Sequence, residues 1–209
     1  MQTKLRNKKL QACQGFTIAE LMVTLVVAAT LAGLAAPNMR VFMQNSQLTS
    51  AVNEMLRTVQ SARTEATKRQ KNVVVCISSN IDAATPACDG SMMNGWIVFQ
   101  DDDGDWERAE SEQLISSFTF DATSMNLLAD ESRRISFAAT GFLSPAGANA
   151  ATQTPSTSMV ICDRRGNVTE AGQSVARGLQ ISPTGRARVT RDVSTIVTLL
   201  ALTGGACPS

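Results

Sequence analysis

The chain has 209 residues, enough for one globular domain of about 140 residues and an additional helical segment. Its formal net charge is +1, from 19 basic and 18 acidic residues, so it is not a globally basic nucleic-acid binder, and such binding must be local. The absence of histidine excludes Ser–His and Cys–His catalytic arrangements, and neither a Walker loop nor a GxGxxG sequence is present. We therefore expect no catalytic residues, no enzyme activity and no cofactor.

An apolar run, residues 16–36, follows a short basic segment that contains Lys4, Arg6, Lys8 and Lys9. As a helix, this run is roughly 30 Å long, enough to cross a bilayer's hydrocarbon core, and the basic segment favours a cytoplasmic N-terminus. Glu20 is its only ionisable side chain. A carboxylate in a membrane segment is costly, so it normally implies a partner group that interacts with it. A cleaved signal peptide and a plain signal anchor are the alternatives, but neither accounts for Gly15 and Phe16 followed by Glu20.

The combination of Gly15, Phe16 and Glu20 resembles the class III signal of type IV pilins and type II secretion pseudopilins. The resemblance implies that prepilin peptidase cleaves after Gly15, that the new N-terminal Phe16 is N-methylated, and that Glu20 pairs with a neighbouring subunit's N-terminal amine during assembly. It also implies a single-pass inner-membrane protein with a periplasmic domain, which becomes extracellular in an assembled pilus. Thr-Ile-Ala at residues 17–19 departs mildly from the common Thr-Leu-Ile.

Cleavage after Gly15 would remove four cations and Cys13, leaving 15 basic against 18 acidic residues, a net charge of −3. The four remaining cysteines are an even number in a segment placed outside the cytoplasm, where disulfides persist. Three connectivities are possible. We favour Cys76–Cys88 with Cys162–Cys207, because each closes a plausible loop and the second secures the C-terminus. Zinc is the less favoured alternative, because the chain has neither CxxC spacing nor histidine.

Beyond Pro37, apolar residues recur every three or four positions up to Ala66, which predicts that an amphipathic helix continues the first helix. From residue 71 onward, short β-rich runs alternate with Gly, Pro, Asn and Asp turn signals. We expect strands at residues 73–78, 96–100, 114–120, 134–138, 159–163, 179–182 and 187–190. Residues 193–202 fit either a strand or a short helix, and residues 144–158 are expected to form an exposed flexible loop.

These patterns predict an α+β fold in which a long N-terminal helix packs on an antiparallel β-sheet, as in type IV pilins. The expected parts are a leader (residues 1–15), a transmembrane or filament-core helix (16–36), an amphipathic helix (37–70) and a β-rich globular domain with a C-terminal basic hairpin (71–209). Residues 95–99, 101–105 and 112–115 resemble the globular domain of the GspH/FimT group, which contains minor pseudopilins of type II secretion and minor pilins of type IV pili.

The acidic stretch of this domain has the spacing of a calcium loop at four positions, 1, 3, 5 and 12, which are occupied by Asp101, Asp103, Asp105 and Glu112. The match to a calcium loop fails at position 6, where the turn glycine is required and Trp106 is present. Gly104 lies two residues too early to serve as that glycine. We interpret the stretch as a solvated acidic turn between strands and predict no metal site.

Residues 164–191 contain six arginines and one acid, Glu170, whereas residues 101–131 contain ten acids and one base. Arg186 and Arg188 are two residues apart on an expected strand, so their side chains point to the same face of that strand. Two guanidiniums on one face can bind adjacent phosphates through bidentate hydrogen bonds. Spacing alone favours solvated arginines at a hairpin tip. However, Gly185-Arg186-Ala187-Arg188 resembles the GRxR motif of FimT-type minor pilins, which bind DNA during natural transformation. The resemblance implies that Gly185 shapes the loop and that Arg186 and Arg188 contact phosphate.

The charge pattern adds Arg177 and Arg191 to these DNA-binding candidates. Since no aromatic stacking partner lies nearby, binding to double-stranded DNA should be directed at the backbone, independent of sequence and sensitive to salt. We predict a FimT-type minor pilin whose partners are other pilins through the N-terminal helix, prepilin peptidase, the inner membrane before assembly, and DNA. The alternative is a structural minor pilin (FimU-like) or a type II secretion pseudopilin (GspH-like) that primes assembly and binds only proteins.

Overall fold

The computed structural model describes residues 15–88, 95–119, 121–130, 132–144 and 157–207, and for residues 35–38 it describes the backbone alone. Most of the predicted leader and most of the predicted loop at 144–158 therefore lie outside the described residues. The chain divides into two compact units, residues 1–43 and 44–209. Helix α1 (Ile18–Arg69) contributes to both units and continues past Pro37, as the sequence predicts.

The described part of the first unit is the N-terminal part of α1. The helix is capped by Thr17, whose Oγ1 accepts a hydrogen bond from the backbone amide of Glu20 at 3.2 Å. Its large apolar side chains are exposed, for example Leu21, Leu25 and Leu31, each more than half exposed. Within the described residues, no one helix has the length and apolar composition for a membrane span, although Ile18–Leu34 and Met39–Arg69 meet that test together as a bent pair.

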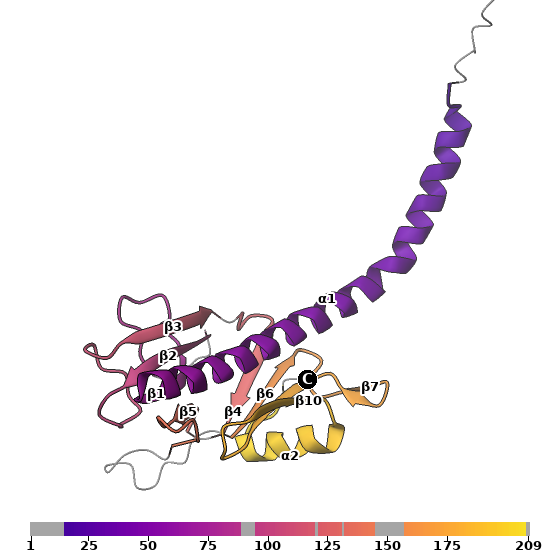
Figure 1. The fold of residues 1–209 in the computed structure, drawn as a ribbon. Coiled ribbons are helices and arrows are strands. Elements are labelled where there is room, and N and C mark those ends of the chain that lie inside the picture. The colour runs from indigo at the N-terminus through magenta and orange to yellow at the C-terminus, as the bar shows by residue number, and fades with distance from the viewer. Residues whose placement is uncertain (1–14, 89–94, 120, 131, 145–156, 208–209) are drawn as a thin grey trace, which may run out of the picture. The chain divides into compact units, whose positions relative to one another are not determined.

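The second unit contains two four-stranded antiparallel sheets (Figure 1). The first sheet has the order β3-β2-β1-β5 and is formed by β1 (Asn72–Ser78), β2 (Gly95–Asp101), β3 (Leu114–Thr119) and β5 (Arg134–Phe137). The second has the order β10-β9-β6-β4 and is formed by β4 (Met125–Ala129), β6 (Ser158–Asp163), β9 (Arg177–Ile181) and β10 (Ala187–Thr190). The remaining elements are a small hairpin, β7 (Thr169–Glu170) and β8 (Gln173–Ser174), and helix α2 (Val193–Thr203).

The main core lies between α1 and both sheets. The apolar stripe of α1 is buried there through Leu48, Val52, Met55, Val59, Ala62 and Ala66, and the sheets contribute residues such as Val75, Trp96 and Ile161. Trp96 also stacks on Phe118 with ring centroids 4.5 Å apart, and its Nε1 donates to Thr58 Oγ1 at 3.1 Å. This second unit therefore has a continuous core of its own that begins at Leu48.

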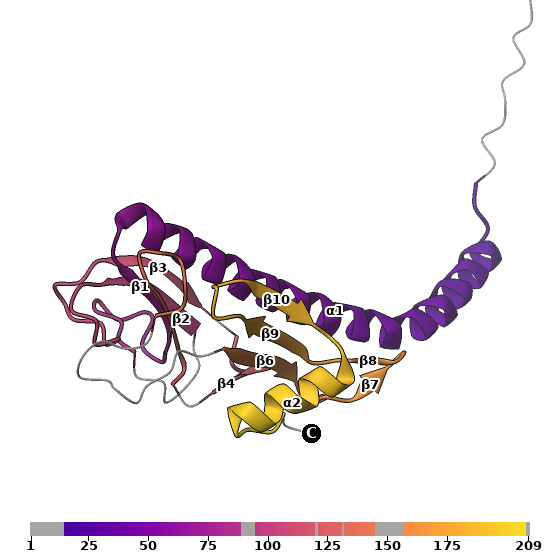
Figure 2. The ribbon, with the colours of Figure 1, turned by 60° about the horizontal axis from the view of Figure 1, so that its bottom comes forward.

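Both sheets have a second buried face, which explains why their central strands are nearly continuous apolar runs. On the first sheet, Val74, Cys76, Ile97 and Phe99 pack with Trp106. On the second, α2 covers Val160 and Cys162 through Ile196 and Leu199 (Figure 2). Asp192 caps α2 by accepting from Thr195 N at 2.8 Å, and Gly204 ends the helix in the left-handed conformation.

The structure confirms the predicted α+β class and its long N-terminal helix. Each of the seven expected strands is present, with ends that differ from the prediction by two residues at most. The strand β4 and the short β7–β8 hairpin were not predicted, and residues 193–202 prove to be helical. The disulfides are Cys76–Cys88 and Cys162–Cys207, with Cα–Cα distances of 5.6 and 6.0 Å, which is the connectivity that the sequence analysis favours.

Candidate nucleic-acid interface

The candidate interface is the β9–β10 hairpin, whose turn is formed by residues 182–186. Ser182 closes this turn, because its backbone amide donates to the carbonyl of Arg186 at 2.9 Å and its Oγ accepts from Arg186 N at 3.1 Å. Gly185 N donates to Ser182 O at 2.8 Å. β10 is an edge strand of the second sheet, so the hairpin ends the sheet on this side.

The tip of the hairpin is held against the body of the second unit. Gly185 is buried and has a φ of +77°, and a Cβ there would lie 2.5 Å from the carbonyl oxygen of Gly141. That same carbonyl accepts a hydrogen bond from Arg63 Nε of α1 at 2.9 Å, and Leu143 N donates to Pro183 O at 3.0 Å. Gly185 thus shapes the turn and lets it approach the chain's own backbone closely.

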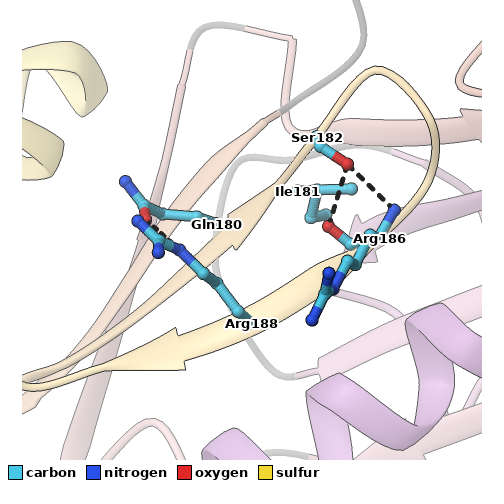
Figure 3. Close-up of a pocket in the computed structure, with 5 residues that line it drawn as sticks. All are labelled: Gln180, Ile181, Ser182, Arg186 and Arg188. Atoms are coloured by element: carbon cyan, nitrogen blue, oxygen red, sulfur yellow. Dashed lines mark hydrogen bonds between the residues drawn. The ribbon is translucent and has the colours of Figure 1, made fainter.

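Arg186 and Arg188 are both exposed and alternate with Ala187 and Val189, which pack against the core. The two arginines therefore project from the solvent side of the hairpin. Arg188 Nε donates to Gln180 Oε1 of β9 at 2.8 Å, and Figure 3 shows these two side chains side by side, with Arg186 next to the turn. Neither arginine takes part in any ion pair between residues that the structure describes.

The two guanidiniums border an open pocket of about 460 Å³, whose lining also includes Gln180, Ile181 and Ser182 (Figure 3). Its donors are two cationic guanidiniums, an amide and a hydroxyl, a set that suits the oxygens of a phosphate group. The sequence analysis did not single out Gln180 or Ser182. Gln180 pairs with Arg188 across the two strands, so the signal for it was the hairpin register and not a local motif.

Arg177 requires a correction. It is buried, only 4% exposed, and its guanidinium Nη1 donates to the backbone carbonyls of Val175 and Ser174. This burial lowers the pKa of Arg177 to about 10, with Arg191 and Arg165 contributing to the decrease. The side chain is a buried donor for its own backbone, so the prediction that Arg177 contacts DNA is not retained.

The other arginines of residues 164–191 do not join the hairpin pair in one patch. Arg191 is half-buried, and its Nε donates to Ser174 O at 3.3 Å. Arg165 forms a 2.7 Å ion pair with Asp163, which is buried. Arg164 is exposed on the β6–β7 connection and donates to Thr123 O at 3.5 Å. The local charge of +5 in the sequence is therefore only partly a surface charge.

The interpretation of residues 101–112 as a solvated acidic turn between strands holds for five of its seven acidic residues, which are exposed, but not for Asp101 and Glu112, which are buried together with Trp106. At the N-terminus, Phe16 and Glu20 are exposed, and nothing lies within 4 Å of the position of a Cβ at Gly15. The cleavage, methylation and pairing assigned to these three residues stay predictions.

The family model of the type II transport protein GspH matches residues 51–185, more than half of the chain. No curated protein sequence matches the chain. Two crystal structures of the type IV minor pilin FimU from Pseudomonas aeruginosa are similar to it at 19% identity. They cover 73% and 70% of this chain and 94% of FimU, with TM-scores of 0.45 and 0.43.

The chain belongs to the GspH family and is a GspH/FimT-like minor pilin or pseudopilin. Membership implies association with other pilin subunits, anchoring in the inner membrane and a periplasmic domain. The family is one of structural proteins and not of enzymes.

Proposed function

We propose that this protein is a minor pilin of a type IV pilus whose β9–β10 hairpin binds the phosphate backbone of extracellular DNA for uptake in natural transformation. The observation that carries this proposal is the pair Arg186 and Arg188, exposed on the solvent side of a braced hairpin with no ion-pair partner among the described residues. Its resemblance to the GRxR motif of FimT-type minor pilins supports the assignment.

The hairpin geometry suits phosphate contacts that are independent of base sequence. Gln180 accepts from Arg188 Nε, which fixes the side chain and leaves both terminal nitrogens for a phosphate. The bonds from Arg63 to Gly141 and from Leu143 to Pro183 hold the turn in place, so little ordering of the backbone is needed on binding. Arg191 is half-buried at the far end of β10 and would add a weaker, longer-range attraction.

The N-terminal segment supplies the assembly function in this proposal. Prepilin peptidase removes residues 1–15, Phe16 becomes the methylated N-terminus, and Glu20 pairs with the N-terminal amine of a neighbouring subunit. The exposed apolar side chains of residues 16–34 and 39–43 provide the surface that the membrane covers before assembly and that other pilins cover afterwards. Residues 37–70 then carry the helix into the globular domain, which is exposed on the pilus.

DNA binding is tested with residues 44–209, the compact unit that contains its own core. Fluorescence anisotropy measures binding to a labelled duplex of random sequence at several salt concentrations. Wild type should bind, and Arg186→Ala with Arg188→Ala should weaken binding at least about tenfold, because the loss of even one hydrogen bond to a charged group costs about 1.5–3 kcal/mol. The dependence of log K on log salt should also become shallower by about 1.8, since each phosphate contributes about 0.9.

The matched control is Arg57→Ala with Lys68→Ala, which removes the same charge from exposed positions of α1, where both side chains form only surface ion pairs. Equal weakening by the two double variants would show that net charge alone attracts DNA and would refute the hairpin site. Thermal unfolding of each variant checks that the domain stays folded.

One observation favours a second candidate, a structural minor pilin or pseudopilin that binds only proteins. β10 is an edge strand, and exposed arginines on an edge strand protect it from pairing with another chain. In that case wild type does not bind DNA even at low salt, and the Arg186 and Arg188 double variant self-associates in sedimentation experiments while the control variant stays monomeric.

A further inference from the structure

The acidic β2–β3 loop, residues 101–112, gathers carboxylates at one point of the first sheet. It contains seven acidic residues and one basic residue. Asp101, at the end of β2, lies close to Asp103 and Asp105, and one carboxylate oxygen from each residue lies within 4.8 Å of the other two. Two oxygens bound to one calcium ion at 2.3–2.6 Å are separated by about 5.2 Å at most, so the cluster has a suitable size.

Asp101 distinguishes this cluster from an ordinary exposed acidic patch. Its side chain is 99% buried, since only 1% is exposed. Oδ1 accepts a hydrogen bond from Gly104 N at 2.7 Å, whereas Oδ2 is buried and has no hydrogen-bond partner among the described residues. A buried carboxylate oxygen without a donor is costly and needs a compensating group.

The surrounding charges do not provide that compensation. The pKa of Asp101 is raised to about 6, mainly by burial; the hydrogen bond from Gly104 N opposes this rise, and the nearby Glu112, Asp103 and Asp105 carboxylates contribute to it. The nearby basic side chains are engaged elsewhere, since Lys71 pairs with Asp102 at 3.1 Å and Arg108 donates to the carbonyls of Pro86 and Glu112. Between described residues, no ion pair reaches Asp101, Asp103 or Asp105.

Glu112 holds the loop in shape and does not face the cluster as a free ligand. Its Oε1 accepts from Asp102 N at 2.8 Å and its Oε2 accepts from Ala109 N at 2.9 Å. Trp106 anchors the same loop by packing with Phe99 and Cys76 on the outer face of the first sheet. The three aspartates are therefore carried on a loop that is fixed at both ends.

We propose that the β2–β3 loop binds one calcium ion through the carboxylates of Asp101, Asp103 and Asp105. Calcium takes six to eight oxygen ligands in flexible geometry, so backbone carbonyls and water complete its shell, whereas magnesium sheds its water reluctantly. The ion supplies the positive charge that the buried Asp101 lacks. The site is independent of the arginine hairpin, which belongs to the other sheet.

The test uses the full-length chain in detergent micelles after chelator treatment. Calorimetric titration with calcium chloride should show one site with a Kd of about 10⁻⁴–10⁻³ M, the range of extracellular calcium modules. The Tm should rise with calcium and much less with magnesium at the same concentration. Terbium offers an optical readout, because Trp106 directly follows Asp105 and can sensitise its emission.

Three variants make the test specific. Asp103→Asn with Asp105→Asn should abolish the heat of binding and the Tm rise, whereas Glu110→Gln, which removes an exposed charge from the same loop, should leave both unchanged. Asp101→Asn keeps the acceptor for Gly104 N but should not respond to calcium, and it should melt in chelator no lower than wild type, because a neutral amide is less costly to bury. A wild type without a calcium response would overturn the proposal, as would equal losses in the Glu110 and the Asp103/Asp105 variants.

Discussion

The close approach of the hairpin tip to Gly141 can be tested by comparing two glycines. Gly185 has a φ of +77° and Gly172, in the β7–β8 turn, has a φ of +78°. A Cβ at Gly185 would lie 2.5 Å from Gly141 O and 3.1 Å from Arg63 Nε, whereas a Cβ at Gly172 would have nothing within 4 Å. Alanine therefore introduces the same backbone cost at both positions and a steric overlap only at Gly185.

The backbone cost of placing alanine in the left-handed region is about 1–2 kcal/mol. Replacing glycine also restricts the unfolded chain, which offsets about 0.4–1 kcal/mol at each site and so cancels in the comparison. The overlap at Gly185 involves a backbone carbonyl, which cannot move aside like the end of a flexible side chain, and overpacking of this kind costs about 1–3 kcal/mol. Gly185→Ala should therefore reduce the free energy of unfolding by about 1–3 kcal/mol more than Gly172→Ala.

The assay is urea unfolding of residues 44–209 followed by tryptophan fluorescence, with the m-value checked for constancy. The reasoning is refuted if the two variants lose the same stability within about 0.5 kcal/mol, the usual effect of a neutral surface change. In that case the turn would not be braced against Gly141, and the fixed placement of Arg186 would have lost its structural basis.

Two further predictions concern residues that hold the second unit together. Arg177→Ala should reduce the free energy of unfolding by about 1–3 kcal/mol, because the buried Val175 carbonyl loses its donor, and it should leave the DNA affinity of the folded protein unchanged. This is measured by urea unfolding and anisotropy, and a loss of affinity without a loss of stability would reinstate Arg177 as a DNA contact. Removing the Cys162–Cys207 disulfide with paired alanines should cost about 4 kcal/mol and removing Cys76–Cys88 about 3 kcal/mol, because their sequence separations are 45 and 12 residues. A larger loss for the shorter loop in urea unfolding would contradict this order.

Periodic apolar residues allowed the main architecture to be predicted. The three- and four-residue spacing from Leu48 to Ala66 places every one of the buried α1 residues on one face, and this is a local property of the sequence. Residues 193–202 were ambiguous because five of the ten are β-branched, which favours a strand, whereas the spacing of Val193, Ile196, Val197 and Leu200 fits a helix. The caps Asp192 and Gly204 were the available signals for helix α2.

The errors at the candidate sites have a common physical origin. Arg177 is buried and donates to the carbonyls of residues 174 and 175, and Asp101 is buried at the end of β2, where it accepts from Gly104 N. Both environments depend on how the chain folds around these residues. Charged residues are exposed on average, so the sequence predicts exposure for both. The tertiary surroundings that bury these two residues cannot be deduced from the residues next to them in the sequence.

The structure also changes how much electrostatic attraction the hairpin can provide. With Arg177 buried and Arg165 paired with Asp163, the surface charge near the turn is reduced to Arg186, Arg188 and the exposed Arg63 of α1, with Arg191 half-buried. Two phosphates neutralised per subunit correspond to a salt slope of about −1.8, so raising the salt fourfold should weaken binding only about twelvefold. A steeper slope for the isolated unit would require additional cations. The exposed Arg63 beside the turn is then the first residue to substitute, followed by Arg164 on the β6–β7 connection, because neither charge is part of any ion pair between described residues.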